Sequence, residues 1–190
     1  MRYQDIVTIL RDFTFSQGVN VKAPMDINEE LIRKIGTYLN FNNGKYISVL
    51  PIESSSRLIL GKLRHFSTHV EVLFNDTALN PCWRRYIIVK ELFHLLMSKN
   101  DEGITEDIDK LVDGLFNASF GFADDIDHEY LAVLFAADFL LPYDLTQAKI
   151  KNPNITATQI AEDFKAPKNL VDLLSMPKHI IMRDEAYKDL

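Results

Sequence analysis

The sequence predicts an α+β fold in which helices surround a small antiparallel sheet. Two observations predict this class. Apolar residues recur at helical spacing near the N-terminus and through the second half, and three short runs rich in β-branched and aromatic residues lie between. The 190 residues, 47% of them hydrophobic, suit one main domain with a small appended segment. We place the main domain at 1–150 and the segment at 151–190.

The bulk properties restrict the class of partner. A net charge of −6 argues against direct binding to nucleic acid or to anionic lipid. There is no apolar run of 18 residues, so we expect no membrane span. Cys82 is the single cysteine, which excludes an internal disulfide and fits a reducing cytoplasm. We therefore expect a cytoplasmic protein.

The first elements follow from periodicity and capping residues. Apolar residues at helical spacing predict a helix over 3–13. A second helix is expected to begin at Asp26, where Asp26 and Glu29 form a capping box after Pro24. The strands are then predicted in three runs, at 45–52, 57–63 and 69–74.

The second half predicts helices with clear boundaries. Asn80 and Pro81 are a strong helix start, because asparagine caps the N-terminus and proline suits the first helical position. Thr156 with Gln159 offers a capping box in the C-terminal segment, and Pro167 can open the helix that follows. The helices are predicted at 82–98, 105–119 and 127–141, with two short ones within 155–175.

Residues 90–94 carry the chemistry of interest. They read Lys-Glu-Leu-Phe-His, one substitution from the zinc-peptidase motif His-Glu-x-x-His. In that motif the two histidines lie one helical turn apart and bind zinc, while the glutamate acts as general base. Lys90 occupies the first ligand position, and a protonated lysine has no lone pair to offer a metal.

Two segments carry a family resemblance. Residues 85–94 (RYIIVKELFH) resemble the RFTLAHELGH segment of the ImmA/IrrE-type metallopeptidases. Residues 129–142 (EYLAVLFAADFLLP) resemble the second signature of that family, E-x-x-A-N-x-F-A-A-x-L-L-M-P. Residues 155–174 are similar to its helix-turn-helix-like tail. The resemblance implies a zincin-like metallopeptidase domain. Members of the family cleave or inactivate a helix-turn-helix repressor of a mobile element or stress response.

The resemblance also assigns roles to residues. Glu91 matches the general base, His94 the second zinc ligand and Glu129 the third, while Lys90 departs at the first ligand. His128 is a weak substitute ligand, since neighbouring helical residues point about 100° apart. Two further departures lie near these positions: Phe93 where glycine is usual, and Val133 where a polar residue is usual.

Lys90 leaves three interpretations open. Its ammonium group could take the place of the zinc and pair with Glu91 and Glu129, which spares buried carboxylates an unpaired charge. Zinc could still bind, with His128 as a rescue ligand, or Lys90 could extend to solvent. We favour the first interpretation. It predicts a pseudo-peptidase with an idle Glu91 and no cofactor, and an active zinc metallo-endopeptidase is the alternative.

The partner we expect is a protein, namely a helix-turn-helix repressor. The tail does not suit DNA, because Lys165 and Lys168 are offset by neighbouring acids. The acidic run 101–113 is expected to be a solvated face that could receive a basic partner. For the remaining histidines and the cysteine we expect packing or surface roles: His65, His69, His179 and Cys82.

Overall fold

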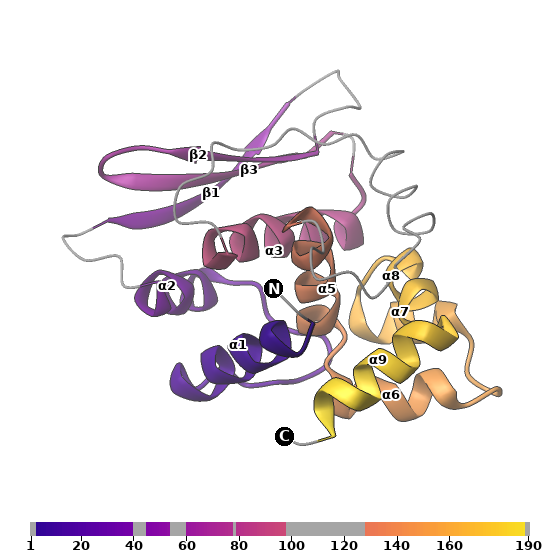
Figure 1. Cartoon of the computed structure of the whole chain (residues 1–190). Helices are drawn as coiled ribbons and strands as arrows, with labels where there is room; N and C mark the ends of the chain where they lie inside the picture. The colour runs from indigo at the N-terminus through magenta and orange to yellow at the C-terminus, as the bar shows by residue number, and fades with distance from the viewer. Residues whose placement is uncertain (1–2, 40–44, 54–59, 78, 98–127, 189–190) are drawn as a thin grey trace.

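The computed structural model describes residues 3–39, 45–53, 60–77, 79–97 and 128–188. Figure 1 shows a three-stranded sheet on one side of the molecule, with helices packed beneath it. The elements are α1 Tyr3–Ser16, α2 Glu29–Tyr38, β1 Tyr46–Ile52, β2 Gly61–His65, β3 His69–Asn75, α3 Pro81–Met97, α5 His128–Leu140, α6 Tyr143–Lys151, α7 Ala157–Phe164, α8 Lys168–Leu174 and α9 Pro177–Tyr187. The α+β class is therefore confirmed.

The two N-terminal helices differ in how well their starts were predicted. α1 occupies the expected segment and buries one apolar face. The predicted start of α2 at Asp26 is wrong, because the side chain of Asn28 accepts a hydrogen bond from Leu31 N and caps the helix. Asp26 instead pairs with Lys22 at 2.7 Å. Beginning at Glu29 places Leu31 in the core.

The sheet has the expected number of strands but a different topology. Its order is β1-β3-β2. β2 pairs with β3 in antiparallel fashion, whereas β1 and β3 run parallel, with Tyr46 opposite His69 and Ile52 opposite Asn75. The prediction of an antiparallel sheet is therefore wrong in part, and the sheet is mixed. The parallel pair arises because β2 occupies the far edge, so that β3 inserts between the first two strands.

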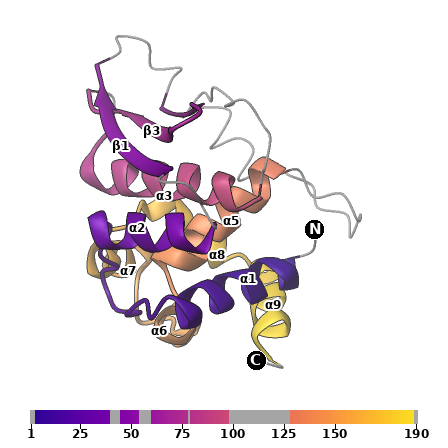
Figure 2. The same ribbon diagram turned by 90° about the vertical axis from the view of Figure 1, so that its left-hand side faces the viewer.

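Two helices form the centre of the molecule. α3 lies under the sheet, and α5 packs against α3 on the side away from it (Figures 1 and 2). Asn80 caps α3 as predicted, since its side chain accepts a hydrogen bond from Trp83 N at 3.0 Å. α5 is apolar on all sides, and from Tyr130 onward every residue in it is buried. Such a helix belongs in the core of a domain.

The C-terminal helices α6 to α9 lie together on one side of α5, and α9 packs against α1 (Figure 1). α7 begins with the predicted capping box between Thr156 and Gln159, and α8 follows Pro167. Arg183 of α9 is fully buried and pairs with Asp138 of α5, with Nε 2.9 Å from Oδ1. Tyr3 of α1 donates a hydrogen bond to the other oxygen of Asp138. This group of side chains links the two ends of the chain.

Two predictions fall outside the described residues: the helix at 105–119 and the acidic run at 101–113. In the part of the chain that is described, no single helix is both long and apolar enough to cross a membrane. The pair Tyr130–Leu140 and Tyr143–Lys151 reaches the required length and hydropathy only when taken together across a 90° bend.

Candidate active site

The motif residues lie in the C-terminal half of α3, where Glu91 faces the sheet at Gly61 and Phe93 faces α5. Lys90 and His94 are one turn apart and so share a face of the helix. Lys90 is among the most buried side chains described, with 1% of its surface exposed. The interpretation that Lys90 extends to solvent is therefore wrong.

Lys90 and Glu91 form an ion pair in this buried setting. Lys90 Nζ lies 3.7 Å from Glu91 Oε1, and only 5% of the Glu91 side chain is exposed. At this separation the two charges attract each other without a short hydrogen bond. Burying an isolated charge costs several kcal/mol, so each of these two groups makes the burial of the other tolerable.

Gly61 of β2 lies directly over Glu91. A Cβ atom at this position would be 2.8 Å from Glu91 Oε1 and 2.5 Å from Cγ2 of Ile87. Real Cβ atoms do not approach other atoms so closely, so any side chain here would displace the carboxylate or the strand. The missing side chain lets the edge strand β2 rest on α3 at the motif glutamate.

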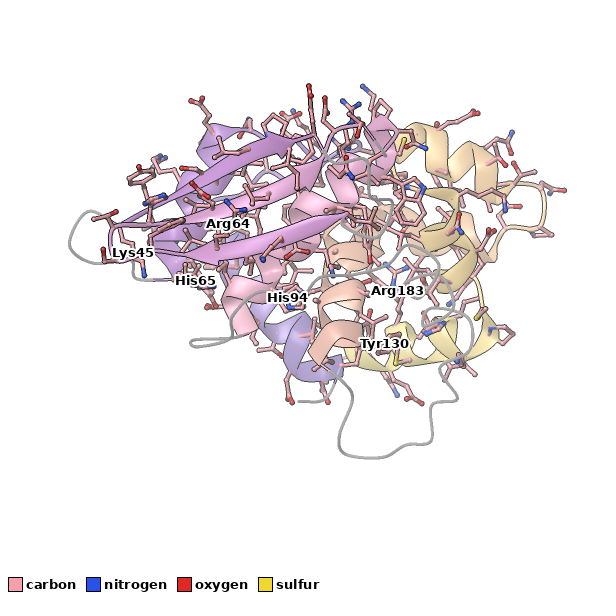
Figure 3. All side chains as sticks on the ribbon, turned by 90° about the horizontal axis from the view of Figure 1, so that it is seen from above. Lys45, Arg64, His65, His94, Tyr130 and Arg183 are labelled. Atoms are coloured by element: carbon pink, nitrogen blue, oxygen red, sulfur yellow. The ribbon has the colours of Figure 1, made fainter. Side chains whose placement is uncertain are left out.

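His94 lies near the C-terminal end of α3, and Figure 3 shows it beside α5. Its residue is partly exposed, although its Nε2 atom is buried. Tyr130 lies in the first turn of α5, close to the predicted ligand Glu129. Its hydroxyl is 2.6 Å from Nε2 of His179 on α9. Burial lowers the pKa of His179 to about 4, so this imidazole is neutral near pH 7.

Phe93 is a core residue. Its ring stacks on Phe135 with centroids 4.4 Å apart and meets Phe139 and Phe13 edge-on at 5.3 and 6.5 Å. These contacts join α3 to α5 and α1. Val133 is also buried, on α5. At both positions where the sequence differs from the family motif, a buried apolar side chain thus stabilises the packing of the central helices.

The remaining predicted residues have varied places. His128 and Glu129 form the first residues of α5, but their side chains lie outside the described part of the structure, so their assigned roles stay predictions. His65 is exposed, and the ring of His69 stacks between Tyr46 and Phe66 at 5.2 and 4.5 Å. These two histidines lie on the sheet. They have the surface and packing roles that we expected.

Zinc is the metal that the resemblance implies, so its fit to these side chains can be tested. Catalytic zinc sites use three protein ligands and a water. Among the residues described, no three His, Cys, Asp or Glu side chains come together. The first ligand position holds an ammonium group that faces Glu91. The side chain at the first ligand position therefore does not fit a zinc ligand, while the side chain of Glu129 lies outside the described part of the structure.

Sequence reasoning missed two features. Gly61 carried no local signal, because its role depends on the approach of β2 to α3. The Asp138–Arg183 pair, in contrast, did carry a signal in the sequence. Asp138 is an acid within the most apolar stretch of the chain, and a buried carboxylate needs a partner. The identity of that partner, 45 positions later, could not be read from spacing.

The comparisons with known proteins agree with this arrangement. No curated protein matches the chain significantly. A family model described as the IrrE N-terminal-like domain, Peptidase_M78, matches residues 46–173. The match runs from β1 through α8 and so includes the sheet, the motif helix and α5. Because it covers most of the chain, this protein belongs to the family of IrrE N-terminal-like domains.

Proposed function

We propose that this chain is a pseudo-peptidase of the ImmA/IrrE family that acts by binding a helix-turn-helix repressor of a mobile element or stress response. In this proposal the ammonium of Lys90 takes the place of the zinc, and Glu91 no longer activates water. His94 and Glu129 are then former ligands that keep a structural role.

The observation that carries the proposal is the burial of Lys90 against Glu91. Zinc needs ligands that present a lone pair, and a buried ammonium next to a carboxylate presents none. Deprotonating Lys90 to make it a ligand would also leave the buried Glu91 charge without this cation. The ion pair therefore favours a site that holds a fixed cation rather than a metal.

Zinc analysis of the purified chain tests the first half of the proposal. We expect less than about one zinc per ten chains after purification without chelators, because one histidine and one carboxylate bind the metal weakly. Lys90→His restores a ligand side chain at the first position and should raise the zinc content, whereas Lys168→His, at an exposed position on α8, is the matched control and should not. A stoichiometric zinc in the unmodified chain would contradict the proposal.

The second candidate is an active zinc metallo-endopeptidase that cleaves such a repressor. Membership of the peptidase family favours it. The two candidates differ in what happens to the partner. Incubation with a copurified helix-turn-helix protein, followed by intact-mass measurement, shows whether the partner is cut. We expect an uncut partner in a stable complex that survives Glu91→Gln, whereas a cut that Glu91→Gln abolishes would establish the peptidase.

A further inference from the structure

We infer that the groove between α2 and the open edge of β1 binds an extended peptide from a partner protein, which adds to the sheet as a fourth strand. Figure 2 faces this side of the molecule, with β1 above α2. The groove is on the opposite edge of the sheet from β2, whose Gly61 covers Glu91. The inference rests on α2 and β1 alone and does not depend on the state of Lys90.

The cavity follows the strand edge. It encloses about 610 Å³ and is lined by six consecutive residues of the chain, from Lys45 to Leu50. A cavity on a sheet face would touch alternate residues, because successive side chains point to opposite faces. Contact with every residue in turn is the pattern of a cavity that follows the backbone of β1. Its volume lies within the range of ligand sites in proteins.

α2 forms the other wall of the groove. The lining residues of this helix share one face, at the spacing i, i+3, i+4, i+7 and i+8. They are Glu29, Ile32, Arg33, Gly36 and Thr37. A helix beside an open strand edge is the geometry in which strand-addition domains hold peptides, with main-chain hydrogen bonds for affinity and side-chain contacts for specificity.

The backbone of β1 presents hydrogen-bonding groups to this groove. Ile52 O accepts a hydrogen bond from Asp76 N, beyond the end of β3, at 3.1 Å, so the polar groups of Ile52 face β3. In a parallel ladder both groups of a residue point the same way, and the direction alternates along the strand. Ile47, Val49 and Pro51 therefore direct theirs outward. Proline has no N–H, and the outward position is where a strand tolerates it.

In the described part of the chain, β1 pairs with a strand on one side only. Two N–H groups and three carbonyl groups thus point away from β3 over a length of about 13 Å, from Ile47 to Pro51, which matches a peptide of roughly five residues. Tyr46 and Leu50 flank the edge with 56% and 41% of their surfaces exposed. Exposed apolar side chains beside an open edge indicate an interaction site.

The side chains of the groove define the chemistry of the peptide. Ile32 on α2 and Ile47 and Val49 on β1 give the groove apolar side chains, which suits apolar residues at alternate positions of the added strand. Arg33 and Lys45 outnumber Glu29, so the groove carries excess positive charge in a protein whose net charge is −6. The occupant is therefore an extended peptide with alternating apolar residues and an acidic residue.

A random decapeptide display library, screened against the full chain, provides the probe. We expect enrichment of peptides with alternating apolar residues and at least one acid. N-methylation of the best synthetic peptide at alternate amides then tests strand addition. One set of positions should weaken binding by about tenfold or more, and the intervening set should leave it unchanged, because only alternate amides face β1.

Protein variants and amide spectra locate the binding. Arg33→Glu should weaken binding by about fivefold or more, whereas Arg11→Glu, an equal change of charge at an exposed position on α1, should not. In the amide spectrum of the labelled chain, Ile47 and Val49 should shift on peptide addition. Absence of enriched peptides, equal effects of the two N-methyl sets, or shifts confined to other elements would overturn the inference. Self-association of the chain through Ile47 and Val49 would also overturn it, since a second copy would then occupy the edge.

Discussion

Lys90 and Glu91 are adjacent residues whose charges are both removed from water. Side chains one position apart on a helix point in different directions, so the 3.7 Å approach requires the long lysine side chain to bend toward its neighbour. Such a pair is weak evidence for stability as a whole, because desolvation offsets the attraction. Removing one partner is a different matter, since the other charge then stays buried without this counterion.

Lys90→Met should lower the free energy of unfolding by about 3 kcal/mol, because it removes the charge beside Glu91 and keeps all but the last atom of the side-chain length. Urea unfolding followed by circular dichroism measures the change. The double variant Lys90→Met with Glu91→Leu should recover most of the loss. Lys168→Met, in the exposed pair with Asp172, is the control and should cost less than about 1 kcal/mol. Equal losses in the single and double variants would show that the pair has no coupling.

At the scale of elements, the contact between β2 and α3 depends on a residue without a side chain. β2 is an edge strand, and its first residue rests on the motif glutamate. The strand can lie this close to the helix because Gly61 leaves space for Ile87 and Glu91. The close approach of β2 to the motif helix thus depends on the missing side chain of Gly61.

Gly61→Ala should lower the free energy of unfolding by about 1–3 kcal/mol, because the new methyl group overlaps Ile87 Cγ2. Ile87→Ala removes the overlapping atom, so the double variant should lose less than the sum of the two single changes. Gly18→Ala is the matched control. It has φ of +56° and no neighbour within 4 Å, so its cost is backbone strain alone and should add to that of Ile87→Ala. Additive losses for Gly61→Ala and Ile87→Ala would contradict the close contact.

At the scale of the whole molecule, two residues of α9, Arg183 and His179, join the C-terminal helices to the core through buried polar contacts. Arg183 pairs with Asp138, and His179 lies 2.6 Å from the hydroxyl of Tyr130. Arg183 also donates to the Leu141 carbonyl at 2.8 Å and to Gln147 at 3.1 Å. Burial raises the pKa of Asp138, and the adjacent Arg183 opposes that rise. The attachment of α9 therefore depends on the charges of Arg183 and Asp138 and on the neutral ring of His179, all of them buried.

The stability of the protein should fall as the pH is lowered from about 6.5 to about 4. His179 has a folded pKa of about 4 against an ordinary value of 6.5, so the unfolded chain binds a proton first and acid favours unfolding. The contribution of neutral His179 to the free energy of unfolding is fully present above pH 6.5 and amounts to at most about 3 kcal/mol. Urea unfolding at several pH values, compared between the unmodified chain and His179→Gln, measures it. Identical pH profiles for the two would contradict a buried neutral imidazole.

The elements that the sequence predicted well are those fixed by local chemistry. Asn80 and the Thr156–Gln159 box cap helices through bonds within one turn, and such bonds can be read from spacing. The direction of β1 could not be predicted, because it depends on where β2 lies in the finished sheet. The Asp138–Arg183 pair likewise joins distant segments. For the site, the favoured interpretation predicted that Lys90 would pair with a buried Glu91, and the ion pair confirms this, whereas the pairing with Glu129 stays a prediction.

The aromatic cluster around Phe93 makes a substitution by glycine at this position costly for the stability of the fold. Restoring glycine at this position would empty a space between Phe13, Phe135 and Phe139 and cost about 3–5 kcal/mol, with about 1 kcal/mol more for glycine inside a helix. That is a large share of the 5–15 kcal/mol by which domains are stable. A histidine at position 90 needs no such refilling of the core. A variant designed to bind zinc through Lys90→His should therefore keep Phe93.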